Sequence, residues 1–495
     1  MRFLFVWPNK DQYGFKPIGI SLLSSILKSK GHKVDLFDTT FIDLGYKSNQ
    51  EIKSRMQVFK PLDTSDYKLN KSDNLEKELI SKLESFKPNI VGISALSDEL
   101  SIGLKISSII KGYDKSIIIL YGNKSATMNY DNIISNENVD YVCRGEGIIF
   151  IQELVDAIDS KRSVTNLNNL IYKVGKDMKI NRLNPLYQNL DDLPYLDWEI
   201  YDNRHFLKPY EGKLETGGDH MITWGCPNSC TYCINHAYRK LYRGKGKYIR
   251  SYSVERMIEE LEYLKKKWNI TFLKFHDEDF CLKDEEYLKE LSNKYSDRVN
   301  IPFTIMVNAK RVNENKVKML KNMNCKSVTI GIETGNQKLR RDILNRYETQ
   351  DDIIYASKLF NHHKIRTSSF NMLGIPFETR DTIMETVELN RLAEIEVPNT
   401  TFFYPLKDTK LRDISIENNF IPDDFSYEYK QGEPSLDLNT ITKKELISIR
   451  ERFLLYIKLP KSFYNLIRKS EEDNECGKYI TKELFKIYND NYREK

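Results

Sequence analysis

Short apolar segments alternate with amphipathic helical stretches through residues 1–155 of the chain. The strand-like segments are 2–7, 33–37, 90–95, 117–121 and 139–143, and the helical stretches between them include 18–30, 76–86 and 99–111. Strands separated by amphipathic helices predict a parallel, doubly wound sheet, which binds ligands beyond the carboxyl ends of its strands. We therefore expect a Rossmann-like domain whose ligand edge is formed by the loops after these strands.

A second series of strand and helix patterns begins near His220, after a connector over residues 156–215 in which the periodicity weakens. Its expected strands are 220–224, 271–275, 302–307, 327–332, 367–373 and 399–404. The clearest helix follows Ser253, because five apolar residues there fall on one stripe. They are Val254, Met257, Ile258, Leu261 and Leu264.

Six such units predict a partial (β/α)6 barrel over residues 216–415, and residues 416–495 predict a charged, helical tail. The predicted fold class is therefore α/β. It consists of an N-terminal doubly wound domain, a connector, a partial barrel and a C-terminal helical region.

Composition and charge narrow the function classes. Of 495 residues, 40% are hydrophobic, and 76 Lys and Arg against 71 Asp and Glu leave a formal net charge of only +5. This weak basic field argues against a dedicated nucleic-acid binder, and we interpret the basic segment 238–248 as a flexible loop. No apolar run approaches the ~20 residues of a membrane helix. We expect a cytoplasmic protein with no membrane partner.

The seven cysteines are distributed unevenly. They are Cys143, Cys226, Cys230, Cys233, Cys281, Cys325 and Cys476. An odd count argues against a disulfide framework, whereas Cys226, Cys230 and Cys233 form a CxxxCxxC motif in the loop after the first expected barrel strand.

Three neighbouring thiolates select zinc or an iron–sulfur cluster, because both are soft enough for sulfur ligands. A structural zinc site requires a fourth ligand, for which His220, His236 and Cys281 are the available residues. None of these lies in a second paired-cysteine motif. We therefore predict an iron–sulfur cluster with one iron open to a small molecule.

A CxxxCxxC motif after the first strand of a βα barrel, with Tyr232 before the last cysteine, resembles the radical S-adenosylmethionine (SAM) superfamily. Three later segments are similar to its DDxF, GIESG and GxPxET motifs, namely 273–280, 331–335 and 374–379. The resemblance implies that Cys226, Cys230 and Cys233 hold a catalytic [4Fe–4S] cluster. SAM would bind the fourth iron, and one electron would cleave it to a 5′-deoxyadenosyl radical.

The same resemblance assigns SAM contacts. Tyr232 would face the adenine, and Asp277, Glu278 or Asp279 would receive the methionine ammonium. Asn308 and Glu333, at two further strand ends, would hold the ribose and carboxylate region. His276, inside the acidic strand end, is expected to face the barrel mouth.

The N-terminal domain resembles that of the cobalamin-dependent branch of this superfamily. The similar segments are 16–20 with 31–34, 139–147 and the connector 190–198. The resemblance implies cobalamin as a further cofactor, with Pro17, Gly19, Ser94, Gly122 and Glu146 beside it. Gly92 would also allow a corrin ring to approach closely.

The chain also departs from this branch. The branch usually carries a GGxH motif where this chain has residues 121–125, and a PGT motif where it has residues 407–409. The GEGE motif of the branch is shortened at residues 145–148. The chain also has no DxHxxG segment that would offer a histidine ligand to cobalt. An alternative is therefore that the domain is a scaffold that no longer binds corrin.

The sequence thus favours a cobalamin-dependent radical SAM enzyme that methylates an unactivated carbon of an unknown small-molecule or peptide substrate, with a flavodoxin- or ferredoxin-type electron donor. A radical SAM cyclase or oxidoreductase is one alternative. A methylthiotransferase is another, but that class has three N-terminal cluster cysteines, and only Cys143 precedes Cys226 here. The non-enzyme alternative is an iron–sulfur binding protein, which turnover of SAM would exclude.

Overall fold

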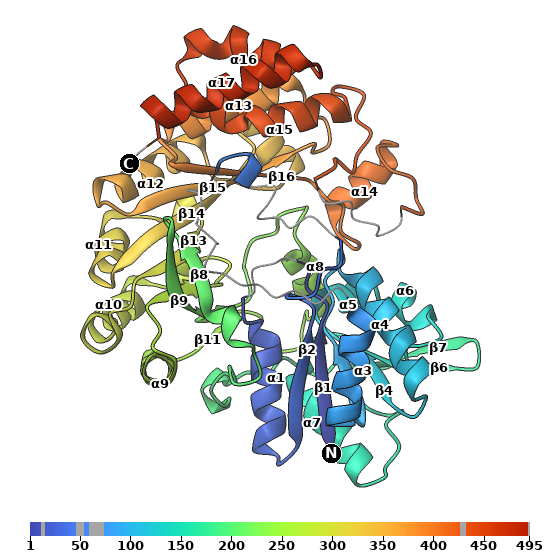
Figure 1. The fold of residues 1–495 in the computed structure, drawn as a ribbon. Coiled ribbons are helices and arrows are strands. Elements are labelled where there is room, and N and C mark those ends of the chain that lie inside the picture. Colours follow the sequence, from blue (N-terminus) through green and yellow to red (C-terminus); the bar gives the residue numbers. More distant parts are fainter. Residues whose placement is uncertain (11–14, 46–53, 59–73, 426–431, 494–495) are drawn as a thin grey trace.

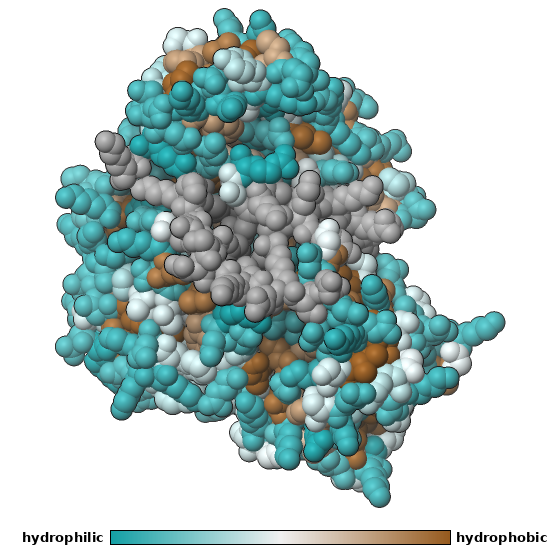
Figure 2. Space-filling model, viewed as in Figure 1, coloured by the Kyte–Doolittle hydropathy of each residue, from teal (hydrophilic) through white to brown (hydrophobic). Residues whose placement is uncertain are grey.

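Two α/β domains lie side by side, and a layer of C-terminal helices packs on the second of them (Figure 1). The computed structural model describes residues 1–10, 15–45, 54–58, 74–425 and 432–493. Within these residues, no helix is long and apolar enough to cross a membrane. The face seen in Figure 2 is largely hydrophilic, with hydrophobic residues in small groups.

The N-terminal domain is built on a seven-stranded sheet in the order β2-β1-β3-β4-β5-β6-β7. The strands are β1 (Arg2–Trp7), β2 (Lys33–Asp38), β3 (Ile90–Ile93), β4 (Ile118–Tyr121), β5 (Tyr141–Cys143), β6 (Leu170–Val174) and β7 (Asp177–Ile180). The first five are parallel, and β6 and β7 are antiparallel. The order 2-1-3-4-5 places the topological switch point between β1 and β3, where doubly wound sheets bind their ligands.

Helices cover both faces of this sheet (Figure 1). They are α1 (Ile18–Ser29), α3 (Leu75–Phe86), α4 (Leu100–Tyr113), α5 (Lys124–Met128), α6 (Tyr130–Ser135) and α7 (Gly147–Asp159). The five predicted strands and the doubly wound arrangement are confirmed. The hairpin β6–β7 was not expected inside the connector. Its outer strand β7 has only four residues, and all of them are exposed.

The second domain is a partial barrel in the strand order β16-β15-β14-β13-β12-β9-β8. Six strands run parallel and β8 pairs antiparallel with β9. The strands are β8 (Leu207–Tyr210), β9 (Lys213–His220), β12 (Phe272–Phe275), β13 (Phe303–Val307), β14 (Cys325–Glu333), β15 (Arg366–Leu373) and β16 (Val397–Phe402). The predicted six-unit parallel barrel is confirmed.

The first barrel strand was predicted at 220–224, and this is wrong. That strand is β9, whereas β10 (Thr223–Trp224) pairs with β11 (Arg250–Ser251) in a separate ribbon. Gly217 and Gly218 interrupt the apolar pattern of β9. A side chain at Gly218 would meet Leu273 at 2.6 Å, and one at Gly217 would overlap Lys208, so close packing requires both glycines.

Helices alternate with the barrel strands along the chain. They are α8 (Ile234–Leu241), α9 (Val254–Trp268), α10 (Glu285–Lys294), α11 (Glu314–Asn322), α12 (Gln350–His362), α13 (Arg380–Leu392) and α14 (Lys410–Glu417). The predicted stripe of α9 is buried, and Ser253 caps the helix by accepting a hydrogen bond from the Arg256 amide.

The segment 238–248 is not simply a loop. Its first residues belong to α8, and Tyr238 and Tyr242 are buried in a cluster with Met128 and Leu186 between the two domains. Sequence patterning missed this because the buried rings alternate with basic residues that remain at the surface.

The predicted helical tail is confirmed as α15 (Lys443–Lys458), α16 (Tyr464–Ser470) and α17 (Glu475–Asn491). Arg391 of α13 fixes α15 in place, because its Nη1 donates to the carbonyl oxygens of Tyr456, Ile457 and Leu459 at 2.6–2.9 Å. These carbonyls lie at the C-terminal end of α15, where a cation is favourable.

Candidate active site at the barrel mouth

The three motif cysteines lie in one loop between β10 and α8. The loop is tied to the segment after β14, since the Thr231 amide donates to Leu344 O at 3.1 Å and Asn345 Nδ2 donates to Ser229 O at 2.9 Å. Gly225 turns the chain into the loop with a φ of +96°, and a side chain there would meet Tyr248 O at 2.5 Å. Contacts with two other segments of the chain therefore hold the loop in position.

The cysteine thiols are shielded from water to different degrees. Burial raises the pKa of Cys230 to about 12 and that of Cys233 to about 11, so a metal centre must displace their protons. Among the described residues, no three His, Cys, Asp or Glu side chains are placed to share a single metal ion. A cubane cluster does not require this, because each thiolate binds a different iron.

Two of the three residues considered as a fourth zinc ligand are buried. His220 Nε2 lies 3.4 Å from Glu260 Oε2, and the Cys281 side chain is completely buried. The third, His236, is half-buried in α8. The donor set of three soft thiols in one loop thus fits an iron–sulfur cluster better than a zinc ion.

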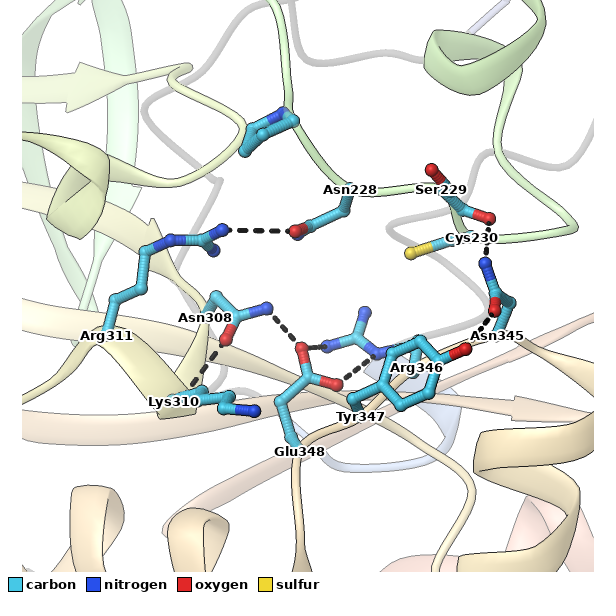
Figure 3. Close-up of a pocket in the computed structure, with 11 residues that line it drawn as sticks. Asn228, Ser229, Cys230, Asn308, Lys310, Arg311, Asn345, Arg346, Tyr347 and Glu348 are labelled. Atoms are coloured by element: carbon cyan, nitrogen blue, oxygen red, sulfur yellow. Dashed lines mark hydrogen bonds and ion pairs between the residues drawn. The ribbon is translucent and has the colours of Figure 1, made fainter.

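A cavity of about 670 Å³ opens beside the cysteine loop (Figure 3). Three cationic side chains, Lys310, Arg311 and Arg346, line it, against the single carboxylate of Glu348. The remaining lining residues are Pro227, Asn228, Ser229, Cys230, Asn308, Asn345 and Tyr347. This site therefore combines one cluster cysteine with a net positive, polar wall.

Arg346 is the centre of the hydrogen-bond network in this wall. Its guanidinium lies 3.3 Å from Glu333 Oε1, 3.1 Å from Glu348 Oε1 and 3.0 Å from the Tyr232 hydroxyl. It also donates to Gly331 O at 2.8 Å. Arg346 thereby joins the cysteine loop to the end of β14, and it is a candidate site residue that the sequence analysis missed.

Two sequence-predicted residues belong to this network. Asn308, after β13, donates through Nδ2 to Glu348, as Figure 3 shows. Glu333 ends β14 with a φ of +61°, and burial raises its pKa, although Arg346 opposes this. Burial also raises the pKa of Tyr232 well above its usual value, so its hydroxyl is neutral.

The three neighbouring acids after β12 have different surroundings. Asp277 is buried and accepts hydrogen bonds from the amides of Ile222 and Thr223 at 3.0 and 2.7 Å. Asp279 is buried and accepts from Arg311 at 2.8 Å. Among these three acids, only Glu278 is exposed, and Lys124 Nζ lies 3.5 Å from its carboxylate.

The predicted cobalamin contacts lie at the carboxyl edge of the N-terminal sheet or next to it. A side chain built on Gly19 or Gly122 would meet nothing within 4 Å, so both positions leave open space. Ser94 follows β3, where Asn123 Nδ2 donates to Ala95 O at 2.8 Å and joins the ends of β3 and β4. Pro17 precedes α1. The open positions fit a large flat ligand.

Two residues at this edge have other contacts. Gly92 is needed inside the sheet, because a side chain there would meet the Phe3 ring at 2.7 Å. Glu146 faces the barrel domain, where its carboxylate lies 2.8 Å from Arg250 Nη2 and accepts from the Tyr187 amide at 2.7 Å.

The ligand edges of the two domains face each other. The Phe15 ring, from the loop after β1, lies 5.6 Å from the His276 ring at the end of β12. Lys124, after β4, donates to Asn235 Oδ1 at 2.6 Å, directly behind the cysteine loop. Residues that follow the carboxyl ends of strands in both domains therefore lie in contact with each other.

Two family models match the chain. Residues 221–389 match the one described as the radical SAM superfamily, and residues 10–155 match the one described as the B12 binding domain. Together they cover both ligand edges and the cysteine loop.

Two curated relatives span most of the chain. An uncharacterized methyltransferase of Pyrococcus horikoshii is 25% identical over 383 residues, which are 77% of this chain and 81% of that protein. The anaerobic magnesium-protoporphyrin IX monomethyl ester cyclase of Rubrivivax gelatinosus is 22% identical over 422 residues, which are 82% of this chain and 68% of that protein.

Two solved structures share the fold. The cobalamin-dependent SAM radical enzyme OxsB, with aqua-cobalamin bound, aligns with a TM-score of 0.70 at 16% identity and covers 99% of this chain and 71% of that chain. The radical SAM methyltransferase TsrM of Kitasatospora setae, with cobalamin and a [4Fe–4S] cluster bound, aligns with a TM-score of 0.63 at 16% identity and covers 84% of this chain and 75% of that chain.

Proposed function

Because the chain joins a B12-binding domain to a radical SAM domain, it is a cobalamin-dependent radical SAM enzyme, and we propose that it methylates an unactivated carbon of its substrate. Its cofactors are a [4Fe–4S] cluster, SAM and cobalamin. When bound, they supply a 5′-deoxyadenosyl radical and a methyl carrier, chemistry for which no amino-acid side chain suffices.

The main support for this proposal is that the ligand edge of the N-terminal domain faces the mouth of the barrel. The chemistry needs the methyl carrier and the radical source on either side of one substrate carbon. Lys124 of the N-terminal domain contacts Asn235 and Glu278 of the barrel, so the open edge at Gly122 lies close to the cysteine loop. This contact supports two cofactor sites that lie next to each other at the junction of the domains.

The cavity beside the cysteine loop fits the methionine end of SAM. Its carboxylate matches the cationic wall formed by Lys310, Arg311 and Arg346. For its ammonium we assign Glu278, because Asp277 and Asp279 already accept hydrogen bonds from protein groups. The remaining proposed contacts are Tyr232, Asn308 and Glu333, which the Arg346 network fixes.

Methylation is favoured over other radical outcomes by the relative from Pyrococcus horikoshii, which is described as a methyltransferase and matches over most of both chains. A second candidate is ring closure or oxidation, since the relative from Rubrivivax gelatinosus is a cyclase. In both cases the proposed substrate is a small molecule or a peptide.

The remaining alternatives have less support. A methylthiotransferase would need a second set of cluster cysteines, whereas Cys143 is buried and burial raises its pKa. An RNA substrate would need exposed rings for stacking, whereas Tyr238 and Tyr242 are buried.

Anaerobic reconstitution with iron, sulfide and hydroxocobalamin tests the proposal. With SAM and a reductant, either dithionite or a flavodoxin- or ferredoxin-type donor, we expect 5′-deoxyadenosine and, only when cobalamin is present, S-adenosylhomocysteine. Formation of 5′-deoxyadenosine without S-adenosylhomocysteine would favour the cyclase or oxidoreductase. Protein that forms neither product would be a binding protein and not an enzyme of this class.

A further inference from the structure

One side chain at the junction of the two domains has no place in the cofactor sites described above. His276 directly follows β12 at the barrel mouth, two residues before Glu278, and its side chain keeps 22% exposure. Its ring lies beside Phe15 of the N-terminal domain, which is itself 40% exposed. The pair therefore places one polar and one apolar ring, both partly exposed, at the contact between the domains.

Asp219 orients this histidine. Its Oδ1 lies 2.9 Å from His276 Nε2, and the carboxylate is completely buried on β9. Although burial opposes its ionisation, Lys208 and Lys16 hold the pKa of Asp219 well below its usual range. Both ammonium groups lie within 3.3 Å of Asp219 Oδ2. An ionised carboxylate in this position accepts the Nε2 proton of His276.

The charges around His276 favour its neutral form. Burial lowers its pKa, Asp219 opposes this, and Lys274 and Lys208 lower it further. A neutral imidazole carries one proton, which Asp219 holds at Nε2, so Nδ1 has a lone pair. Within the described part of the chain, Nδ1 makes no hydrogen bond.

We propose that His276 is a substrate-contacting residue, whose Nδ1 accepts a hydrogen bond from an N–H or O–H group of the substrate while a flat apolar part of the substrate lies on Phe15. The substrate class is therefore a planar, unsaturated molecule with a hydrogen-bond donor on or next to its ring. Exposed aromatic rings bind such molecules by offset stacking. The inference rests on the proposed function only in placing the substrate at this mouth.

The test uses two probes that differ only in the donor, indole and 1-methylindole, titrated against the reconstituted full chain at millimolar concentration by ligand-observed NMR. A single neutral hydrogen bond predicts that indole binds about three to ten times more tightly. In His276→Phe this preference should vanish, while both probes still bind. In His276→Gln, whose amide oxygen can accept, part of the preference should return.

His363→Phe is the matched control. His363 also faces a carboxylate, since its Nε2 lies 3.0 Å from Glu314, but it lies at the end of α12 and away from the mouth. This variant should keep the full preference for indole.

Three results would overturn the proposal. The first is wild-type protein that binds neither probe or binds both equally. The second is a preference for indole that survives in His276→Phe, and the third is loss of hydroxocobalamin from His276→Phe, which would place the corrin against His276. Formation of 5′-deoxyadenosine is measured in the same preparations. Its absence from the wild type would contradict the proposed function, whereas its presence without an indole preference would contradict only the role of His276.

Discussion

The two ligand edges that face each other are built in opposite ways. At the barrel mouth, Asp277, Asp279 and Glu333 are all buried and bound by backbone amides or arginines. At the edge of the N-terminal sheet, Gly19 and Gly122 face open space. A dense polar network preorganises a site for a small charged ligand, whereas small residues allow a large flat ligand to approach the backbone. The difference matches a SAM site opposite a corrin site.

Removing the cysteines tests the barrel side most severely. A triple variant should abolish both the 4Fe–4S absorbance and the formation of 5′-deoxyadenosine, because no other described thiol lies in this loop. It combines Cys226→Ala, Cys230→Ala and Cys233→Ala. The N-terminal edge should still retain hydroxocobalamin. Cys476→Ser, an exposed thiol in α17, is the control and should change none of these signals.

The network at the barrel mouth should be sensitive to its central cation. Arg346→Ala leaves Glu333 and Glu348 without their partner, so the free energy of unfolding should fall by about 3–5 kcal/mol, as for other broken buried ion pairs. Urea unfolding measures this loss. Arg341→Ala removes an exposed arginine on the neighbouring turn and should change stability little. Equal effects would mean that the network adds no stability.

The barrel edge should also respond to pH through Asp277. Burial raises its pKa from 3.8 to about 6, so the folded state holds this proton more tightly than the unfolded state. Its stabilising contribution is complete below about pH 4 and is lost as the pH rises through 6, a change of about 3 kcal/mol. Compared with Asp277→Asn, the wild type should therefore become less stable across this range in urea unfolding.

Asp284→Asn controls for the loss of a nearby carboxylate. Asp284 is exposed and caps α10, a position where asparagine serves equally well. This variant should keep the wild-type pH dependence. If Asp277→Asn also kept the wild-type pH dependence of stability, then burial would not raise the pKa of Asp277.

The N-terminal edge should show the smallest effect, and only in corrin binding. Gly122→Leu fills the open space, so hydroxocobalamin should bind about tenfold more weakly, as expected for moderate steric overlap. The cluster absorbance should not change. Gly112→Leu, at another open glycine in α4, should leave corrin binding intact. Unchanged binding in Gly122→Leu would mean that the ligand lies elsewhere.

Much of this architecture could be predicted from local patterns. The parallel strands β1 to β5 and the barrel strands from β12 onward follow apolar runs, and the stripe of α9 follows the helical period. The first barrel strand was misplaced because its glycines satisfy packing that the local pattern does not show: Gly217 packs against Lys208 of β8, and Gly218 against Leu273 of β12. The hairpin β6–β7 was missed because its outer strand buries nothing.

The sequence by itself determined the cysteine loop, because all three thiols lie within eight residues and need no distant partner to be recognised. Only the tertiary structure decided which acids are available to a ligand. Arg346 meets Tyr232 across 114 positions of the chain, and His276 meets Asp219 across 57. Such pairs depend on which strand ends become neighbours, and burial then fixes the charge of each group. No local pattern contains that information.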